Sequence, residues 1–197
     1  MRAPFFVTAA AGTADLLAAE LSALGIAGVR EAQGGVACEG ELAEAYRACI
    51  ESRLALRVLW QLARFPAADA DAIYAGVRGI DWSAQLGTED TLAVDFSGSV
   101  PGISNTQFGA QRVKDAIVDQ FRERTGARPS VDRAAPTLRI NAHAARGALT
   151  IAVDLSGESL HRRGYRGGQG AAPLKENLAA AILVRAGWPA IAAAGGS

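Results

Sequence analysis

Arginines are the residues of this chain best suited to chemistry, because they gather in its second half. A run at residues 161–166 reads His-Arg-Arg-Gly-Tyr-Arg and contributes Arg162, Arg163, Tyr165 and Arg166. An arginine guanidinium donates two parallel hydrogen bonds to a phosphate and stacks on bases, and a tyrosine ring also stacks. We therefore predict that this run contacts RNA.

More cations precede that run, on a predicted helix and in the segment that follows it: Arg112, Lys114, Arg128, Arg133 and Arg139. The helix would begin near Asn105 and Gln107, where free backbone N–H groups and a partial positive charge favour an anion. We predict that these seven residues also bind RNA. The alternative for the helix cations is structural, because cations near a helix C-terminus, such as Arg122 and Arg124, stabilise the helix dipole.

The distribution of charge points the same way. The chain has 197 residues with 20 Lys and Arg against 20 Asp and Glu. Residues 1–103 hold 7 cations and 13 anions, whereas residues 104–170 hold 11 cations and 6 anions. Such a difference indicates two modules, of which the basic one is a candidate for nucleic acid. A solvated surface without a partner is the alternative.

Other kinds of site have little support in the sequence. The two histidines, His143 and His161, have no Cys, His or acidic partner at metal-ligand spacing, and Cys38 and Cys49 match no metal or redox motif. The chain has no nucleophile elbow and no phosphate-binding glycine loop. We predict no metal, no cofactor and no catalytic residue in this chain, and reduced, packed thiols in a cytoplasmic protein.

Composition bounds the class of protein. Half of the residues are hydrophobic and a fifth are charged, which is typical of a globular chain with a core. No apolar run approaches the roughly 20 residues that a membrane helix needs, so we predict no membrane partner.

The first half alternates strands and helices as a ferredoxin-like sandwich does. Strands are predicted at residues 5–8, within 28–39 and at 54–65, with helices at 13–24, 41–51 and 69–79. The helix at 41–51 is predicted to turn one face inward: Leu42, Ala45, Tyr46, Cys49 and Ile50. The order β-α-β-β-α-β-α predicts an α+β fold.

The second half repeats the pattern around one long helix. Ser104 and Gln107 form a capping-box pattern, and Val113, Ile117 and Phe121 form an inward stripe. Strands are predicted at residues 91–97, 138–144 and 148–155, and a last helix at 174–186. Residues 190–197 are small, apolar and featureless, and we expect the natural chain to continue beyond them.

Several long stretches, in the right order, resemble one family. Those similar to a THUMP domain are Ser104–Ala110, Val113–Asp119, Arg128–Pro136, Ile151–Gly157 and Leu160–Arg166. Gln33–Val36 and Ser52–Arg57 resemble an N-terminal ferredoxin-like part, and Ala172–Ile182 with Gly187-Trp188 resembles the first helix of a methyltransferase domain. The family is that of the bacterial RlmL-type 23S rRNA guanine-N2 methyltransferases.

The resemblance implies three parts: a ferredoxin-like unit at residues 1–80, a THUMP domain at 81–160, and a basic linker with a helix at 161–197. In the family, THUMP domains bind structured RNA and present it to a Rossmann-like domain that uses S-adenosylmethionine. The DPxCGSGT-type and NPPY-type motifs of that domain are absent here. The implied function is an RNA-binding, substrate-positioning module for 23S rRNA without the catalytic domain. The alternative is a ferredoxin-like module that binds a protein or metabolite and has no RNA role.

Overall fold

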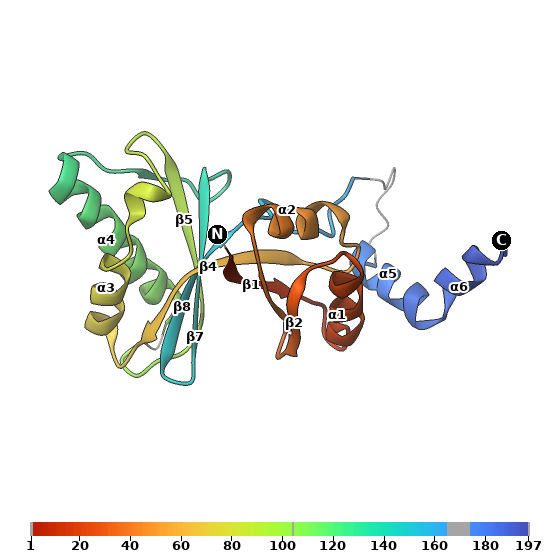
Figure 1. The fold of residues 1–197 in the computed structure, drawn as a ribbon. Helices are drawn as coiled ribbons and strands as arrows, with labels where there is room; N and C mark the ends of the chain where they lie inside the picture. Colours follow the sequence, from red (N-terminus) through yellow and green to blue (C-terminus); the bar gives the residue numbers. More distant parts are fainter. Residues whose placement is uncertain (1, 104, 165–173, 197) are drawn as a thin grey trace. The chain divides into compact units, whose positions relative to one another are not determined.

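The computed structural model describes residues 2–103, 105–164 and 174–196. The chain divides into two compact units, Met1–Trp60 with Leu155–Ser197, and Gln61–Asp154 (Figure 1). We call them unit 1 and unit 2 and describe each by itself. The domain boundaries predicted from the sequence, 1–80, 81–160 and 161–197, concern domains and not these compact units. They stay a prediction.

Unit 1 contains a four-stranded antiparallel arrangement. Its elements are β1 (Ala3–Thr8), α1 (Ala14–Ala23), β2 (Ala27–Ala32), β3 (Gly35–Gly40), α2 (Leu42–Glu51) and the start of β4 (Arg57–Pro66). The strand order is β2-β3-β1-β4, with Phe5 opposite Cys38 on one side and opposite Trp60 on the other. A β-α-β-β-α-β chain with this order confirms the predicted ferredoxin-like unit.

Helices α1 and α2 of unit 1 cover the same face of its sheet. Phe5 and Val7 alternate along β1 and are buried together with Leu17 of α1 and Ala45 of α2. Alternate residues of a strand point to one face, so both helices pack on that face.

Helix α2 corrects one prediction about this core. Its inward residues are Ala45, Ala48 and Cys49, whereas Leu42, Tyr46 and Ile50 are exposed, Ile50 at 73%. Helical spacing predicts two adjacent apolar stripes on α2, and the stripe with the smaller side chains is the buried one.

Residues after unit 2 return to unit 1. The Leu155 N–H donates to the Val58 carbonyl over 2.9 Å, and the Leu160 N–H donates to the Leu56 carbonyl over 2.9 Å. Two helices follow, α5 (Glu176–Arg185) and α6 (Trp188–Ala193). The prediction that residues 190–197 are featureless was wrong, because α6 extends to Ala193. The helix can include Pro189, since this residue lies in the first turn, where its missing N–H costs no hydrogen bond.

Unit 2 holds the rest of β4 and the remaining elements. They are α3 (Ala70–Arg78), a single 3-10 turn η1 (Trp82–Ala84), β5 (Thr91–Gly98), α4 (Thr106–Thr125), β6 (Ser130–Val131), β7 (Leu138–Ala145) and β8 (Ala148–Asp154). The strand order is β4-β8-β7-β5-β6. Strand β5 is parallel to β6 and β7, and β7 is antiparallel to β8.

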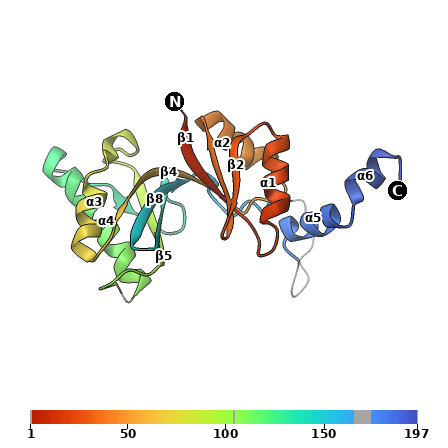
Figure 2. The same ribbon diagram turned by 60° about the horizontal axis from the view of Figure 1, so that its bottom comes forward.

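Helices α3 and α4 lie together against the strands of unit 2, which Figures 1 and 2 both show. The predicted stripe of α4 is confirmed: Val113 and Ile117 are fully buried and Phe121 is 5% exposed. They pack with Leu92 of β5 and Ile140 of β7 in one core. Among the described residues, no helix is long and apolar enough to cross a membrane.

Candidate nucleic-acid interface

The start of α4 is fixed by Asn105 and Gly109. The Asn105 side chain accepts a hydrogen bond from the Gln107 N–H over 2.7 Å, so Asn105 is the N-cap. Ser104, the predicted cap, lies outside the described residues. A Cβ on Gly109 would stand 2.8 Å from the Phe96 ring, so glycine lets α4 approach β5 closely. Asn105 therefore acts as a cap through its amide oxygen.

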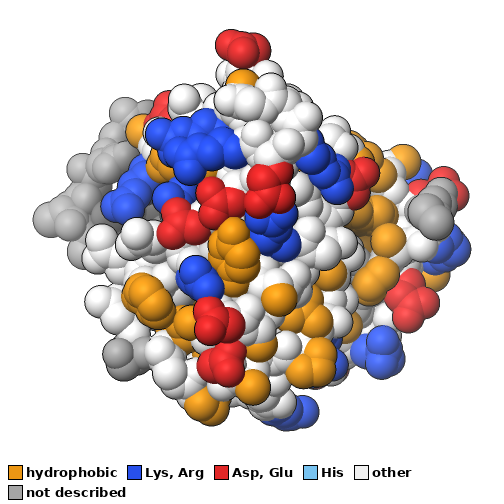
Figure 3. All heavy atoms as spheres, turned by 90° about the vertical axis from the view of Figure 1, so that its left-hand side faces the viewer, with side chains coloured by type: hydrophobic (Ala, Val, Ile, Leu, Met, Phe, Trp, Pro, Cys, Tyr) orange, Lys and Arg blue, Asp and Glu red, His pale blue; other side chains and the backbone are white. Residues whose placement is uncertain are grey.

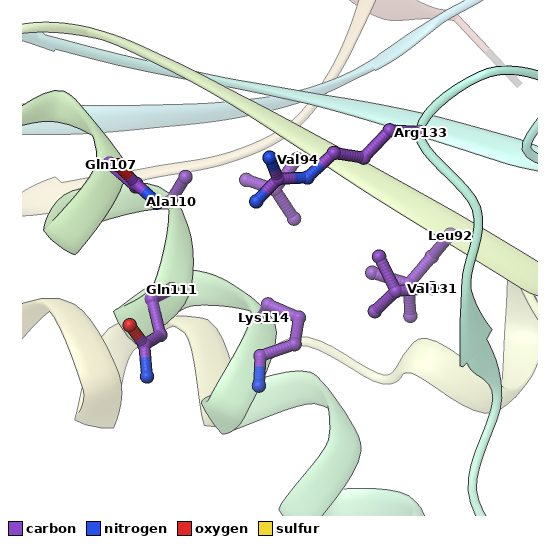
Figure 4. Close-up of a pocket in the computed structure, with 8 residues that line it drawn as sticks. All are labelled: Leu92, Val94, Gln107, Ala110, Gln111, Lys114, Val131 and Arg133. Atoms are coloured by element: carbon purple, nitrogen blue, oxygen red, sulfur yellow. The ribbon is translucent and has the colours of Figure 1, made fainter.

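A cavity of about 240 Å³ opens beside this part of α4 (Figure 4). Helix α4 contributes one face at spacings of three and four residues: Gln107, Ala110, Gln111 and Lys114. Leu92 and Val94 of β5, Val131 of β6 and Arg133 complete the lining. We call this the α4 cavity. It combines an apolar floor with two amides and two cations.

The cations of the α4 cavity differ in their surroundings. The Arg133 side chain extends across Val94 toward Gln107 and Ala110, as Figure 4 shows. Within the part of the chain that the structure describes, its guanidinium has no hydrogen bond or ion pair. The Lys114 ammonium contacts the neighbouring Asp115 carboxylate, and the Lys114 side chain is 26% exposed. Arg133 is thus the cation with more donors to offer a ligand.

The loop that carries Arg133 is held from both sides. The Asp132 carboxylate accepts from the Ala135 and Ala134 N–H groups over 3.1 and 2.8 Å, and these bonds lower the pKa of Asp132. The Arg139 guanidinium donates to the Arg133 carbonyl over 3.1 Å and pairs with Asp95 at 3.3 Å. Arg139, a predicted RNA-binding residue, therefore positions the backbone of Arg133.

Arg112 lies apart from the cavity although it is two residues from Lys114. Its guanidinium pairs with Asp71 at 2.5 Å, donates to the Ala70 carbonyl over 3.1 Å and stands 4.3 Å from the centre of the Tyr74 ring. The Tyr74 hydroxyl in turn donates to Asp119 over 2.8 Å. These contacts join α3 to α4, so the predicted RNA-binding Arg112 has a structural role here.

The remaining arginines of α3 and α4 are paired with acids. Arg122 pairs with Asp119 at 3.4 Å, Arg124 pairs with Asp81 at 2.7 Å, and Arg78 pairs with Glu123. Figure 3 shows positive and negative side chains interspersed on the face of the molecule that it presents. Unit 2 as a whole has 10 Lys and Arg against 11 Asp and Glu, counted over residues 61–154. The excess of cations in residues 104–170 is therefore not a property of the folded unit.

The run at residues 161–166 is only partly described, since Tyr165 and Arg166 lie outside the described residues. Arg163 donates to the Ile50 carbonyl over 3.2 Å and to the Ser52 carbonyl over 2.7 Å, at the end of α2. Arg162 pairs with Glu158 at 3.4 Å. Arg163 therefore closes the C-terminus of α2, where a cation is favourable.

Arg128, in the segment between α4 and β6, is exposed and has no ion pair within the described ranges. It stays a predicted RNA contact. Sequence reasoning missed Gln111 and the apolar residues of the cavity floor. The sequence could have indicated Gln111, because it lies four residues after Gln107 and three before Lys114, which places all three on one face of the helix.

Metal or thiol chemistry finds no support in the described ranges. Among those residues, no group of three His, Cys, Asp or Glu side chains could hold a metal ion. Cys38 and Cys49 are buried and form no disulfide. Burial raises the pKa of the Cys38 thiol to about 12, which keeps it protonated and unreactive.

Family models match both units. A model of the RlmL ferredoxin-like domain matches residues 4–59, and a model of the THUMP domain matches residues 67–154. The chain therefore contains an RlmL-type ferredoxin-like domain and a THUMP domain. The matched ranges fall within unit 1 and unit 2, respectively, and the α4 cavity lies in the THUMP domain.

Curated relatives extend the match over the whole chain. Ribosomal RNA large subunit methyltransferase K/L of Pseudomonas paraeruginosa is 54% identical over 192 residues, which is 98% of this chain and 26% of that protein. The protein of the same name from Methylococcus capsulatus is 54% identical over 197 residues, which is 100% of this chain and 27% of that protein. The chain thus spans about a quarter of the length of these relatives.

Solved structures share the fold. A protein described as a predicted N6-adenine-specific DNA methylase from Listeria monocytogenes is 26% identical, with a TM-score of 0.81, over 93% of this chain and 48% of that chain. TrmN from Thermus thermophilus is 23% identical with a TM-score of 0.67, over 94% of this chain and 55% of that chain, and shows the fold alone. Each of these chains continues well beyond the region that is shared.

Proposed function

We propose that this chain is an RNA-binding, substrate-positioning module of an S-adenosylmethionine-dependent 23S rRNA guanine-N2 methyltransferase. The observation that carries the proposal is the 54% identity, along the whole chain, to proteins named ribosomal RNA large subunit methyltransferase K/L. Those relatives are about four times longer than this chain, and the proposal places the catalytic step in their remaining length. The cytoplasm, where rRNA is modified, is the proposed location.

The geometry of unit 2 supports RNA as the ligand. Lys114, Arg128 and Arg133 offer cations for phosphates, and the exposed amides of Gln107 and Gln111 offer donors and acceptors for base edges. Arg112, Arg139 and Arg163 hold the fold in place and act indirectly at most. We assign the RNA contact chiefly to the α4 cavity and the Arg128 segment.

The methyl donor has no place in the α4 cavity. A cavity of about 240 Å³ is smaller than the roughly 300–1,000 Å³ of sites for drug-sized ligands. Its cations also suit phosphate better than the sulfonium of S-adenosylmethionine, which is itself positive. We therefore derive no step of methyl transfer from these residues.

A division of labour explains why such a module is useful. A methylated base must leave the RNA stack to enter a catalytic pocket, and little sequence information surrounds one base. A separate domain that grips the RNA elsewhere supplies affinity and register. The module proposed here would fix which stretch of rRNA reaches the catalytic domain.

Ultraviolet cross-linking to protein-free large-subunit rRNA tests this proposal. We expect cross-linked peptides from residues 105–133, and competition by large-subunit rRNA at lower concentration than by duplex DNA. Cross-links confined to unit 1, or equal competition by duplex DNA, would argue for the alternative of a ferredoxin-like module with no specific RNA role.

A further inference from the structure

We propose that the α4 cavity binds one unpaired nucleotide of the RNA, with the base inside and its neighbouring phosphates at Lys114 and Arg133. The proposal rests on the RNA-binding function above and specifies its ligand. It predicts that RNA with a bulged or looped nucleotide is bound in preference to fully paired RNA.

The size of the cavity sets the size of the ligand. About 240 Å³ of space, open on one side, suits one planar base whose sugar and phosphates lie outside at the rim. An intact double helix cannot enter, because its bases are stacked and paired. A base must be splayed out of the helix to reach the floor, as in single-stranded loops and bulges.

The floor of the cavity suits the face of a base. Val94 of β5 and Ala110 of α4 line the floor, and Val131 is 51% exposed at the rim. Leu92 also lines the cavity but is fully buried, so it supports the floor and offers no surface to a ligand. The exposed side chain of Val131, next to the cation Arg133, can pack against the flat face of a base. The Arg133 guanidinium points into the cavity that Val94 also lines (Figure 4), so its plane can stack on a base bound there.

The two glutamines suit the edge of a base. Gln107 and Gln111 lie one turn apart on α4, and neither side-chain amide has a hydrogen-bond partner among the described residues. Each amide can both donate and accept, so together they can satisfy the polar edge of a base. Glutamine binds base edges in this way in nucleic-acid complexes.

The cations sit where the backbone of such a nucleotide must leave. Arg133 enters from the loop after β6 and Lys114 from α4, on different elements of the cavity. A nucleotide that is inserted between them places its two phosphates near the rim. The fold holds this arrangement through Asp132 and Arg139, which fix the loop of Arg133.

The test is a titration of the chain with two hairpin RNAs that differ only by one bulged nucleotide. The bulged position carries 2-aminopurine, whose fluorescence reports stacking, and the paired hairpin carries the same label in its stem. We expect the bulged hairpin to bind about tenfold more tightly. In Gln107→Ala/Gln111→Ala that preference should fall below about threefold.

Two further variants separate the roles of Arg133. Arg133→Lys keeps the charge and loses the plane, so the preference for the bulge should fall while the dependence of affinity on salt stays the same. Arg64→Ala is the matched control, since Arg64 is an exposed cation of unit 2 without an ion pair in the described ranges. It should leave the preference unchanged, and thermal melting verifies that each variant is folded.

The outcomes separate this proposal from the broader one. Equal affinity for both hairpins, or a preference that survives the double glutamine variant, overturns the nucleotide site but leaves an RNA-binding module. Failure of the chain to bind either hairpin or any rRNA fragment at low salt overturns both.

Discussion

Gln120 is the residue whose replacement tests the packing of unit 2 most sharply. It lies in the C-terminal half of α4 with 3% of its surface exposed. Its Oε1 accepts from the Trp82 N–H over 3.1 Å, and its Nε2 donates to the carbonyls of Arg78 and Ile80 over 2.8 and 2.7 Å. One side chain thus provides hydrogen-bond partners for backbone groups at the end of α3 and in the turn at Trp82.

The expected cost follows from these three hydrogen bonds. Each contributes about 1 kcal/mol net, and a buried N–H that is left without a partner costs a further 1–3 kcal/mol or so. We therefore expect Gln120→Leu to lower the free energy of unfolding by about 4–6 kcal/mol. That is a large part of the roughly 5–15 kcal/mol that stabilises a typical domain.

Urea unfolding followed by tryptophan fluorescence measures this cost. Trp82 is fully buried in unit 2, and Trp60→Phe with Trp188→Phe leaves it as the only tryptophan. Gln111→Leu, which changes an exposed amide of the same helix, should shift the free energy by less than about 0.5 kcal/mol. A loss below about 1 kcal/mol for Gln120→Leu would show that these hydrogen bonds do not hold α4 to α3.

Three further predictions concern other parts of the chain. Phe121→Ala should lower the free energy of unfolding of unit 2 by about 3–5 kcal/mol in the same assay, because it empties part of the core. Arg163→Ala should lower the free energy of unfolding of unit 1 by about 1–2 kcal/mol, since the end of α2 loses two donors, whereas Arg162→Ala should cost little. Burial, followed by the charge of Lys175, lowers the pKa of His161 below 6.5, so the folded state binds this proton less readily than the unfolded state. The neutral His161 therefore contributes to the free energy of unfolding above about pH 6.5, and this contribution is lost as the pH falls through the pKa of the folded state. The melting temperature of His161→Gln should depend less on pH between about 7.5 and 5.5 than that of the unchanged chain.

Much of the fold could be predicted because apolar residues repeat along the chain at the spacing of a helix or a strand. Val113, Ile117 and Phe121 repeat at helical spacing with no competing apolar stripe, and all three are buried. Helix α2 has two such stripes, and spacing could not decide between them. The buried stripe is Ala45, Ala48 and Cys49, and only the packing of α2 in the folded unit selects it.

The site could be predicted only in part, because it depends on contacts between distant residues. Strand β6 has two residues, and its pairing of Val131 with Leu92 is what brings the Arg133 loop to α4. No periodic pattern signals so short a strand. Arg112 and Lys114 look equivalent in the sequence, but two residues turn a helix by about 200°, which places them on opposite sides.

An equilibrium titration of this chain with fragments of large-subunit rRNA, at about 50 mM and about 200 mM salt, tests the central claim most directly. For about three phosphate contacts, made by Lys114, Arg128 and Arg133, the affinity should fall by roughly 20- to 40-fold between these conditions. One fragment should also be preferred over the others at both. Absence of binding at the lower salt concentration, or binding of every fragment alike, would contradict the assignment of this chain as an RNA-positioning module.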